Sequence, residues 1–127
     1  MARILVVDDR PDVATAIARM LSNHETATET DPRQAVARVE HGERFDIVLC
    51  DLNMPDMNGR EVSDALAHAP GPHPVVLMMS GGENVDRLFA TGRAVLIKPF
   101  NGKELRELVS AMLHDHDWAA HFPREQA

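Results

Sequence analysis

The chain has 127 residues, a length that predicts one domain with a single buried core. Its 20 acidic and 13 basic residues give a net charge of −7, which argues against a general binder of nucleic acids or membrane surfaces, because such binders need basic patches. Cys50 is the one cysteine, so no intramolecular disulfide can form, and without a membrane-spanning apolar stretch or a signal peptide the sequence predicts a cytoplasmic protein.

The first part of the chain predicts two strand–helix units. Residues 4–7 form an apolar run that is too short for a helix, which indicates a buried strand. A helix over residues 11–21 follows, since proline is tolerated in a first turn and apolar side chains then recur at helical spacing. Residues 25–30 are polar and β-branched, which favours an edge strand. Residues 31–42 predict a short helix between an Asp-Pro start and a His-Gly end.

The middle of the chain carries the third predicted strand, residues 47–50, which ends abruptly at Asp51. A lone acid at the tip of a buried strand has a raised pKa unless a cation lies beside it, so Asp51 calls for a positive partner. Turns are predicted at residues 54–55 and 58–59, and the second turn leads into a helix. The proline-rich segment 69–74 is then predicted to be a loop.

The last part of the chain predicts two more strands, residues 75–79 and 94–97, with a short helix at about 84–90 between them. The final helix begins at an Asn101 cap, and its inner face is formed by Leu105, Leu108, Val109, Met112 and Leu113. We therefore expect a domain over residues 1–113, followed by a polar tail or helix extension over residues 114–127.

Strands that alternate with helices predict a parallel α/β sheet covered on both faces, and right-handed crossovers make that sheet doubly wound. In such a sheet the carboxyl ends of the strands lie at one edge, where ligands bind. Strand ends are often polar simply because they meet solvent. Here, however, the identities suggest one shared pocket, since four predicted strands end at Asp8-Asp9, Asp51, Ser80 and Lys98.

The residue types in this pocket suggest phosphoryl chemistry. Three carboxylates repel one another, so a cation is predicted, and oxygen-only ligation favours Mg²⁺. Adjacent strand residues point in opposite directions, so one of Asp8 and Asp9 would ligate directly and the other through water. Asp51 would be the nucleophile that forms an aspartyl-phosphate. Lys98 would supply fixed positive charge, and Ser80 a hydroxyl donor, to the phosphoryl oxygens.

These motifs resemble those of response regulator receiver domains, members of the CheY-like superfamily that serve two-component phosphorelay systems. The resemblance covers residues 3 to about 113. A Lys-Pro pair alone would be weak, whereas the whole ordered set is specific: Asp8-Asp9, then Asp51 with Met54-Pro55 and Gly59, then Ser80, then Lys98-Pro99-Phe100.

The resemblance implies a flavodoxin-like, five-stranded parallel sheet with strand order 2-1-3-4-5. It implies that Asp51 accepts a phosphoryl group from a histidine kinase or a histidine phosphotransfer protein. Mg²⁺, for which Mn²⁺ can substitute, would be held by Asp9, Asp51 and the main-chain carbonyl of Asn53, with Asp8 in support. A homodimer or an effector domain is a further implied partner, whereas direct binding to nucleic acid or to a membrane is not.

The resemblance also bears on how a signal would leave the domain. It implies a cis peptide bond between Lys98 and Pro99, which proline makes accessible. Many receivers carry Tyr or Phe three residues before the lysine, whereas this chain has Val95 there and no tyrosine at all. The segment between Ser80 and Lys98 is short for the family, which predicts a reduced fourth helix. We therefore expect the signal to leave through the first helix or the C-terminal tail.

Three residues are candidates for tuning the hydrolysis of the aspartyl-phosphate. Asn53 and Gly82 lie two residues beyond Asp51 and Ser80, positions that influence this rate in the family. Gly82 offers no side chain to orient or block water, so the rate should depend mainly on Asn53 and Arg10. The alternative for Arg10 is a plain surface charge.

The sequence favours a signalling switch that has no external substrate over three other functions. A phosphohydrolase of the haloacid-dehalogenase kind also uses a strand-end aspartate and Mg²⁺, but its two acids lie two apart after the first strand and it carries a cap domain. A receiver-like module that is never phosphorylated should have lost an acid-pair member, Asp51 or Lys98, and all are present. A flavodoxin-type cofactor binder is disfavoured, since no phosphate loop rich in Gly, Ser or Thr follows the first strand.

Overall fold

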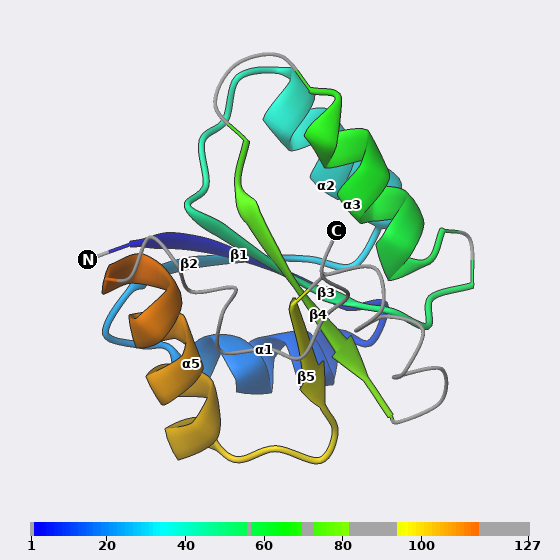
Figure 1. Ribbon diagram of the computed structural model, residues 1–127. Helices are drawn as coiled ribbons and strands as arrows, with labels where there is room; N and C mark the ends of the chain where they lie inside the picture. Colours follow the sequence, from blue (N-terminus) through cyan, green and yellow to red (C-terminus); the bar gives the residue numbers. More distant parts are fainter. Residues whose placement is uncertain (1, 56, 70–72, 82–93, 115–127) are drawn as a thin grey trace, which may run out of the picture.

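The structure of the protein, a computed structural model, describes residues 2–55, 57–69, 73–81 and 94–114. Strands and helices alternate along the chain (Figure 1). Their order is β1 (Arg3–Val7), α1 (Pro11–Met20), β2 (Glu25–Glu29), α2 (Pro32–Glu40), β3 (Ile47–Asp51), α3 (Gly59–Ala67), β4 (Val75–Ser80), β5 (Ala94–Ile97) and α5 (Gly102–His114).

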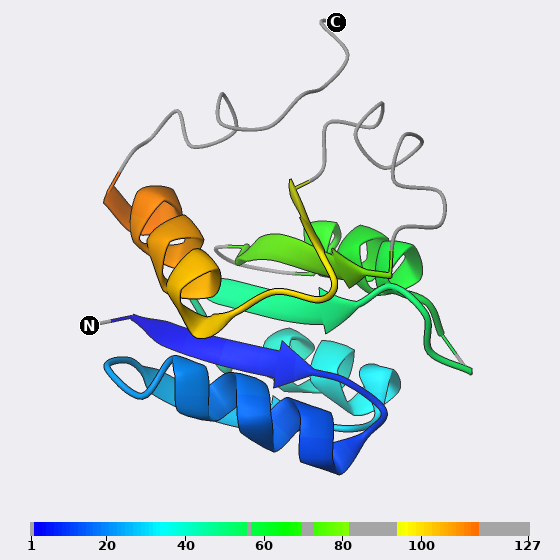
Figure 2. The same ribbon diagram turned by 90° about the horizontal axis from the view of Figure 1, so that it is seen from below.

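The strands form one parallel sheet in the order β2-β1-β3-β4-β5. The chain starts near the middle of the sheet at β1, moves outward to β2, and then crosses to the other side through β3, β4 and β5. The strand order therefore reverses between β1 and β3. The arrowheads of β1, β3 and β4 point the same way (Figure 2). The residues that follow these strands consequently gather at one edge, where parallel α/β sheets bind ligands.

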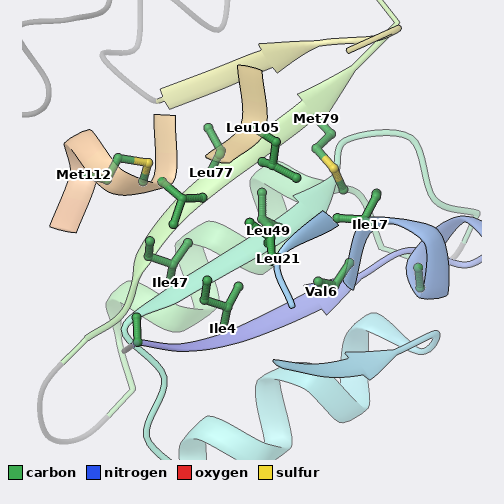
Figure 3. Close-up of a cluster of buried hydrophobic side chains, with 13 residues drawn as sticks. Ile4, Val6, Ile17, Leu21, Ile47, Leu49, Leu77, Met79, Leu105 and Met112 are labelled. Carbon is green, nitrogen blue, oxygen red and sulfur yellow. The ribbon is translucent and has the colours of Figure 1, made fainter. Parts of the chain in front are cut away.

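The helices cover both faces of the sheet, with α2 and α3 on one side and α1 and α5 on the other (Figure 1). This follows from the alternation of side chains along a strand: Ile4 and Val6 of β1 face α1 and α5, whereas Leu5 and Val7 face α2 and α3. The larger core (Figure 3) joins Ile4 and Val6 to buried helix residues on the same side of the sheet: Ala14, Ile17, Leu105, Val109 and Met112.

Short polar side chains determine where three helices begin. Asp31 caps α2, because its carboxylate accepts a 2.9 Å hydrogen bond from Arg33 N. Asn58 and Glu61 form a reciprocal capping box at the start of α3. Asn101 caps α5 through a 2.8 Å hydrogen bond from a backbone N–H of the first turn. Such caps satisfy N–H groups that have no partner within the helix.

The predicted elements are confirmed to within one or two residues wherever the structure describes the chain. β1 begins one residue earlier than predicted, because Arg3 pairs in register with Glu25 of β2. The predicted helix at about 84–90 and nearly all of the predicted tail, residues 115–127, lie outside the described residues. None of the helices within the described ranges is long and apolar enough to cross a membrane.

Candidate functional site

Four strands end at the same edge of the sheet, and the last residue of each strand or the residue directly after it is polar. Backbone hydrogen bonds hold neighbouring strand ends together: Lys98 N donates to Ser80 O over 2.6 Å, and Leu52 N donates to Met79 O over 2.9 Å. The residues predicted to share one pocket accordingly lie at one edge: Asp8, Asp9, Asp51, Ser80 and Lys98.

Asp8 is fully buried at the end of β1. Its Oδ1 accepts a 3.0 Å hydrogen bond from Arg10 N, whereas its Oδ2 has no hydrogen-bond partner among the described residues. Burial raises the pKa of Asp8, and the negative charge of Asp51 adds to this effect, which the Arg10 bond and the Lys98 charge oppose only in part. A buried carboxylate with an unpartnered oxygen is costly, so this geometry indicates a site for a cation.

Asp51 ends β3, with 8% of the residue exposed to solvent. Its Oδ1 accepts a 3.1 Å hydrogen bond from Asn53 N, and its Oδ2 lies 3.4 Å from Lys98 Nζ. The same Nζ is 3.7 Å from Asp8 Oδ2. One ammonium therefore lies between two carboxylates, which is the positive partner that a strand-end acid requires.

The acidic residues of the site could hold a metal ion. Asp8, Asp9 and Asp51 each offer a carboxylate oxygen, and these oxygens lie within 4.8 Å of one another. Lys98 supplies one positive charge against three negative charges, which leaves the cluster under-compensated. An all-oxygen donor set suits Mg²⁺ better than Zn²⁺, which prefers nitrogen and sulfur ligands. The residues present thus fit a hard divalent cation.

A family model for the response regulator receiver domain matches residues 4–110. The chain belongs to this family. It is thus a receiver domain of the two-component systems of signal transduction. The acidic cluster, Ser80 and Lys98 all lie within the matched residues.

The receiver domain has relatives among larger regulators. It is 36% identical over 108 residues to the transcriptional regulatory protein TcrA of Mycobacterium tuberculosis and 35% identical over 120 residues to the DNA-binding response regulator MtrA of Mycolicibacterium smegmatis. These matches cover 81% and 91% of this chain, but only 42% of TcrA and 52% of MtrA. The chain therefore spans about half the length of these relatives.

Solved structures resemble the receiver domain over most of its length. A CheY-like receiver protein from Methanospirillum hungatei has a TM-score of 0.77 at 27% identity, covering 92% of this chain and 97% of that one. TrrA from Thermotoga maritima, in complex with Mg²⁺ and BeF, gives 0.77 at 26% identity, covering 88% and 99%. The receiver domain of the hybrid histidine kinase CckA gives 0.73 at 30% identity, covering 88% and 99%. Together with the strand order, these likenesses establish the CheY-like, flavodoxin-like fold.

The other site residues predicted from the sequence are Pro99 and the three candidates for tuning hydrolysis. The peptide bond between Lys98 and Pro99 is cis. The guanidinium of Arg10 lies 3.5 Å from Asp12 in an exposed ion pair. Asn53 is exposed beside Asp51, and Gly82 lies outside the described residues.

Cys50 and Ser80 are both fully buried. Burial raises the pKa of the Cys50 thiol to about 12, and the Asp51 charge adds to this, so the thiol stays protonated and inert at neutral pH. Ser80 lies at the end of β4, next to Lys98 in the backbone hydrogen-bond pattern. Its position agrees with the hydroxyl role predicted from the sequence, which remains a prediction.

Sequence analysis missed a groove beside the site. It has a volume of about 580 Å³ and runs between α1 and the segment that follows β5. Three of its lining residues are charged and the others are apolar: Arg10, Asp12, Val13, Ala16, Ile17, Met20, Lys98, Pro99 and Phe100. The apolar pattern of α1 could have predicted this groove. Val13 and Met20 are partly exposed, and they widen the apolar face of the helix beyond its buried residues.

Proposed function

We propose that this receiver domain takes a phosphoryl group from a phosphohistidine donor onto Asp51, in a Mg²⁺-dependent reaction, and changes conformation as a result. The observation that carries the proposal is the position of the Asp51 carboxylate. Asn53 N holds one of its oxygens, and Lys98 Nζ lies 3.4 Å from the other. A carboxylate that is held and charge-compensated in this way is oriented for attack on phosphorus, since phosphoryl transfer depends mainly on positioning and electrostatics.

The transfer exchanges one bond at phosphorus for another. A carboxylate oxygen of Asp51 bonds to phosphorus, the phosphorus–nitrogen bond of the donor breaks, and the electron pair stays on the imidazole nitrogen, which takes a proton from solvent. Lys98 stays close to Asp51 and offsets negative charge on the transferred group. The hydroxyl of Ser80 donates a hydrogen bond to a second phosphoryl oxygen. A bound Mg²⁺ would supply further positive charge to these oxygens.

The metal ligands that we propose are the carboxylates of Asp9 and Asp51 and the main-chain carbonyl of Asn53, with Asp8 in support. The proposal is supported by the spacing of the three carboxylates and by the unpartnered Oδ2 of Asp8. Mn²⁺ would satisfy the same oxygen donors.

The proposed role is that of a switch that turns over no external substrate. Water ends the signal by hydrolysing the aspartyl-phosphate, and the side chains of Asn53 and Arg10 tune this rate. Gly82, the third tuning position, contributes no side chain to it. Asn53 is supported as a tuning residue by its exposed position beside Asp51, and Arg10 by its backbone contact with Asp8.

The proposed donor is a histidine kinase or a histidine phosphotransfer protein. Its phosphohistidine has to reach Asp51, so its surface has to lie against the same edge of the domain. The groove between α1 and residues 98–100 is supported as the docking surface, because it shares Lys98 with the site and most of its lining residues are apolar. Downstream, the switch would act through a homodimer or an effector domain, as the regulatory names of the longer relatives suggest.

Acetyl phosphate supplies the test, because it removes the need for the natural donor. We expect the wild-type domain to gain an acid-stable, base-labile phosphoryl group only with Mg²⁺ present, and Asp51→Asn to gain none. Lys98→Met should slow the modification, whereas Lys103→Met, an exposed lysine of α5, should leave it unchanged. A wild-type domain that stays unmodified with Mg²⁺ and acetyl phosphate overturns the proposal. Steady turnover of a phosphomonoester would favour the hydrolase instead.

A further inference from the structure

Gly59, the first residue of α3, lies unusually close to the end of β3. A methyl carbon added at Gly59 would lie 3.0 Å from Asp51 O and 3.0 Å from Leu52 Cα, which is closer than side chains normally come to other atoms. Both neighbours are backbone atoms, so they cannot rotate away as the end of a side chain would. Gly59 N also donates a 3.0 Å hydrogen bond to Leu52 O. The helix start and the strand end are thus in direct backbone contact.

Both partners of this backbone contact, residues 51–52 and the start of α3, are held in place by other interactions. Leu52 N donates to Met79 O over 2.9 Å, and the Leu52 side chain is buried in a small cluster with Met78 and Val95. On the other side, the Asn58 capping box fixes the start of α3. The buried residues Val62 and Leu66 fix the rest of α3 against the core. Added bulk at Gly59 would therefore displace residues 51–52 or lift α3.

A displacement of residues 51–52 would reach the acidic cluster directly. Asn53 N holds Asp51 Oδ1, and Asp51 Oδ2 lies 3.4 Å from Lys98 Nζ, so a backbone shift changes both contacts. We propose that Gly59 is a positioning residue: its missing side chain allows α3 to hold the turn of residues 51–53 at the place where Asp51 and Asn53 can bind a divalent cation. This inference rests on the proposed function for its metal, but not for the backbone contact itself.

Gly102 provides a matched control, because it is the first residue of α5 just as Gly59 is the first residue of α3. A methyl carbon at Gly102 would approach Arg106 Nη1 to 2.7 Å. That atom is the end of an exposed, flexible side chain, which can move aside. Gly102→Ala should thus leave residues 51–53 in place. Val62→Ala is a second control, because it removes buried packing from α3 without adding bulk at the contact.

The first measurement is made without metal, on amide resonances and amide hydrogen exchange. Gly59→Ala should shift the resonances of Leu52 and Asn53 and speed exchange at Leu52, whose hydrogen bond to Met79 would be strained. Gly102→Ala should change neither residue. If Gly59→Ala leaves both amides unchanged, the inference is overturned, whatever the fate of the proposed function.

The second measurement is the Mg²⁺ dissociation constant, taken from titration of the same resonances at conditions where every variant is fully folded. We expect Gly59→Ala to bind Mg²⁺ at least about tenfold more weakly than wild type, since groups that orient metal ligands typically carry 10- to 100-fold in affinity. Val62→Ala should unfold more easily yet bind like wild type. Equal affinities for Gly59→Ala and Gly102→Ala overturn the inference. A wild-type domain that binds no Mg²⁺ instead overturns the proposed function.

A third measurement uses only the wild-type domain, so it tests the inference even if the Gly59→Ala variant does not fold. In the wild-type domain, Mg²⁺ should slow hydrogen exchange at Gly59, because its bond to Leu52 O belongs to the same unit as the ligand turn. The amide of Arg106 on α5 serves as the reference. The inference is overturned if Mg²⁺ shifts the Asn53 resonance but leaves the rate of hydrogen exchange at the Gly59 amide unchanged.

Discussion

The two ends of the sheet use similar charged residues in opposite ways. At the end where β1 and β3 begin, Arg3, Arg38, Glu43 and Phe45 form what we call the amino-end cluster. Arg38 donates to both carboxylate oxygens of Glu43, and the guanidinium carbons of Arg3 and Arg38 lie 4.8 and 5.5 Å from the Phe45 ring centre. At the other end, three carboxylates lie together, Lys98 forms ion pairs with two of them, and Asp8 Oδ2 has no hydrogen-bond partner in the described part of the chain.

The difference separates a structural network from a functional one. Hydrogen bonding to Arg38 lowers the pKa of Glu43, so that acid is stabilised in its charged form. Burial raises the pKa of Asp8, so its charged form is destabilised until something else binds there. Charge that is left under-compensated in a folded protein is typical of sites that await a ligand.

The largest expected effect comes from neutralising Asp8, the buried acid whose Oδ2 accepts no hydrogen bond in the described part of the chain. Asp8→Asn should weaken Mg²⁺ binding by about 100-fold, because it takes away one of the three clustered carboxylates. In the metal-free protein the same change should stabilise the fold by about 1 kcal/mol, since it removes a buried negative charge beside Asp51. Metal titration and urea unfolding with a chelator present measure the two effects.

Glu43→Gln is the control for that prediction at the other end of the sheet. It also neutralises one carboxylate, but it should leave Mg²⁺ affinity unchanged and should destabilise the fold, because Arg38 loses its charged partner. If Asp8→Asn and Glu43→Gln shift the free energy of unfolding in the same direction, the distinction between the two ends fails.

The next effect is the loss of the arginine that organises the amino-end cluster. Arg38→Met should destabilise the fold by about 2 kcal/mol, because Glu43 loses two charge-assisted hydrogen bonds and Phe45 loses one cation–π contact. Arg33→Met, an exposed arginine of the same helix, should change the free energy of unfolding by no more than about 0.5 kcal/mol. Similar losses for both variants would show that the cluster contributes no more than an ordinary surface charge.

A smaller effect is a pH dependence of opposite sign at the two ends. The folded pKa of Glu43 is lowered from 4.5, so its stabilisation is present above pH 4.5 and is lost as the pH falls through the folded value. The folded pKa of Asp8 is raised from 3.8, so the metal-free fold loses stability as the pH rises from 3.8 through the folded value.

Urea unfolding across the acidic range, with a chelator present, measures these two contributions. The curve for Glu43→Gln should lack the gain of stability with rising pH, and the curve for Asp8→Asn should lack the loss. Saturating Mg²⁺ should remove the Asp8 contribution in the wild-type domain, because the ion binds the charged form. A wild-type and an Asp8→Asn curve that run parallel would contradict the assignment to Asp8.

The carboxyl-end site could be predicted from the sequence because its signals are local. Buried parallel strands are continuous apolar runs, so their ends are visible, and the polar residue at each end is adjacent to its strand. The amino-end cluster could not be predicted in this way. Arg3, Arg38 and Phe45 belong to different elements, and only the packed fold brings them together.

Two features of the site itself were also beyond the sequence. Residues 58–59 predicted a turn that leads into a helix, and the helix does begin at Gly59, but the 3.0 Å approach of Gly59 to residues 51–52 depends on how α3 packs. Likewise, the sequence predicts that Asp8 belongs to the pocket, but it does not show which of the two carboxylate oxygens accepts a hydrogen bond. Both depend on how closely neighbouring elements approach each other, to within a few tenths of an ångström. Patterns of residues along the chain do not encode such distances.

The smallest expected effect concerns the exposed margin of the amino-end cluster. Arg3 Nε lies 3.8 Å from Glu25, but the Glu25 side chain is 68% exposed, so solvent screens the pair. Glu25→Gln should therefore cost only a few tenths of a kcal/mol, as exposed ion pairs usually do. Urea unfolding at low salt and at about 1 M salt measures it, and the difference from wild type should vanish at high salt. A loss of stability as large as that of Arg38→Met, and equally large at high salt, would contradict this prediction. It would show that an exposed ion pair stabilises the fold as much as the hydrogen-bonded pair of Arg38 and Glu43.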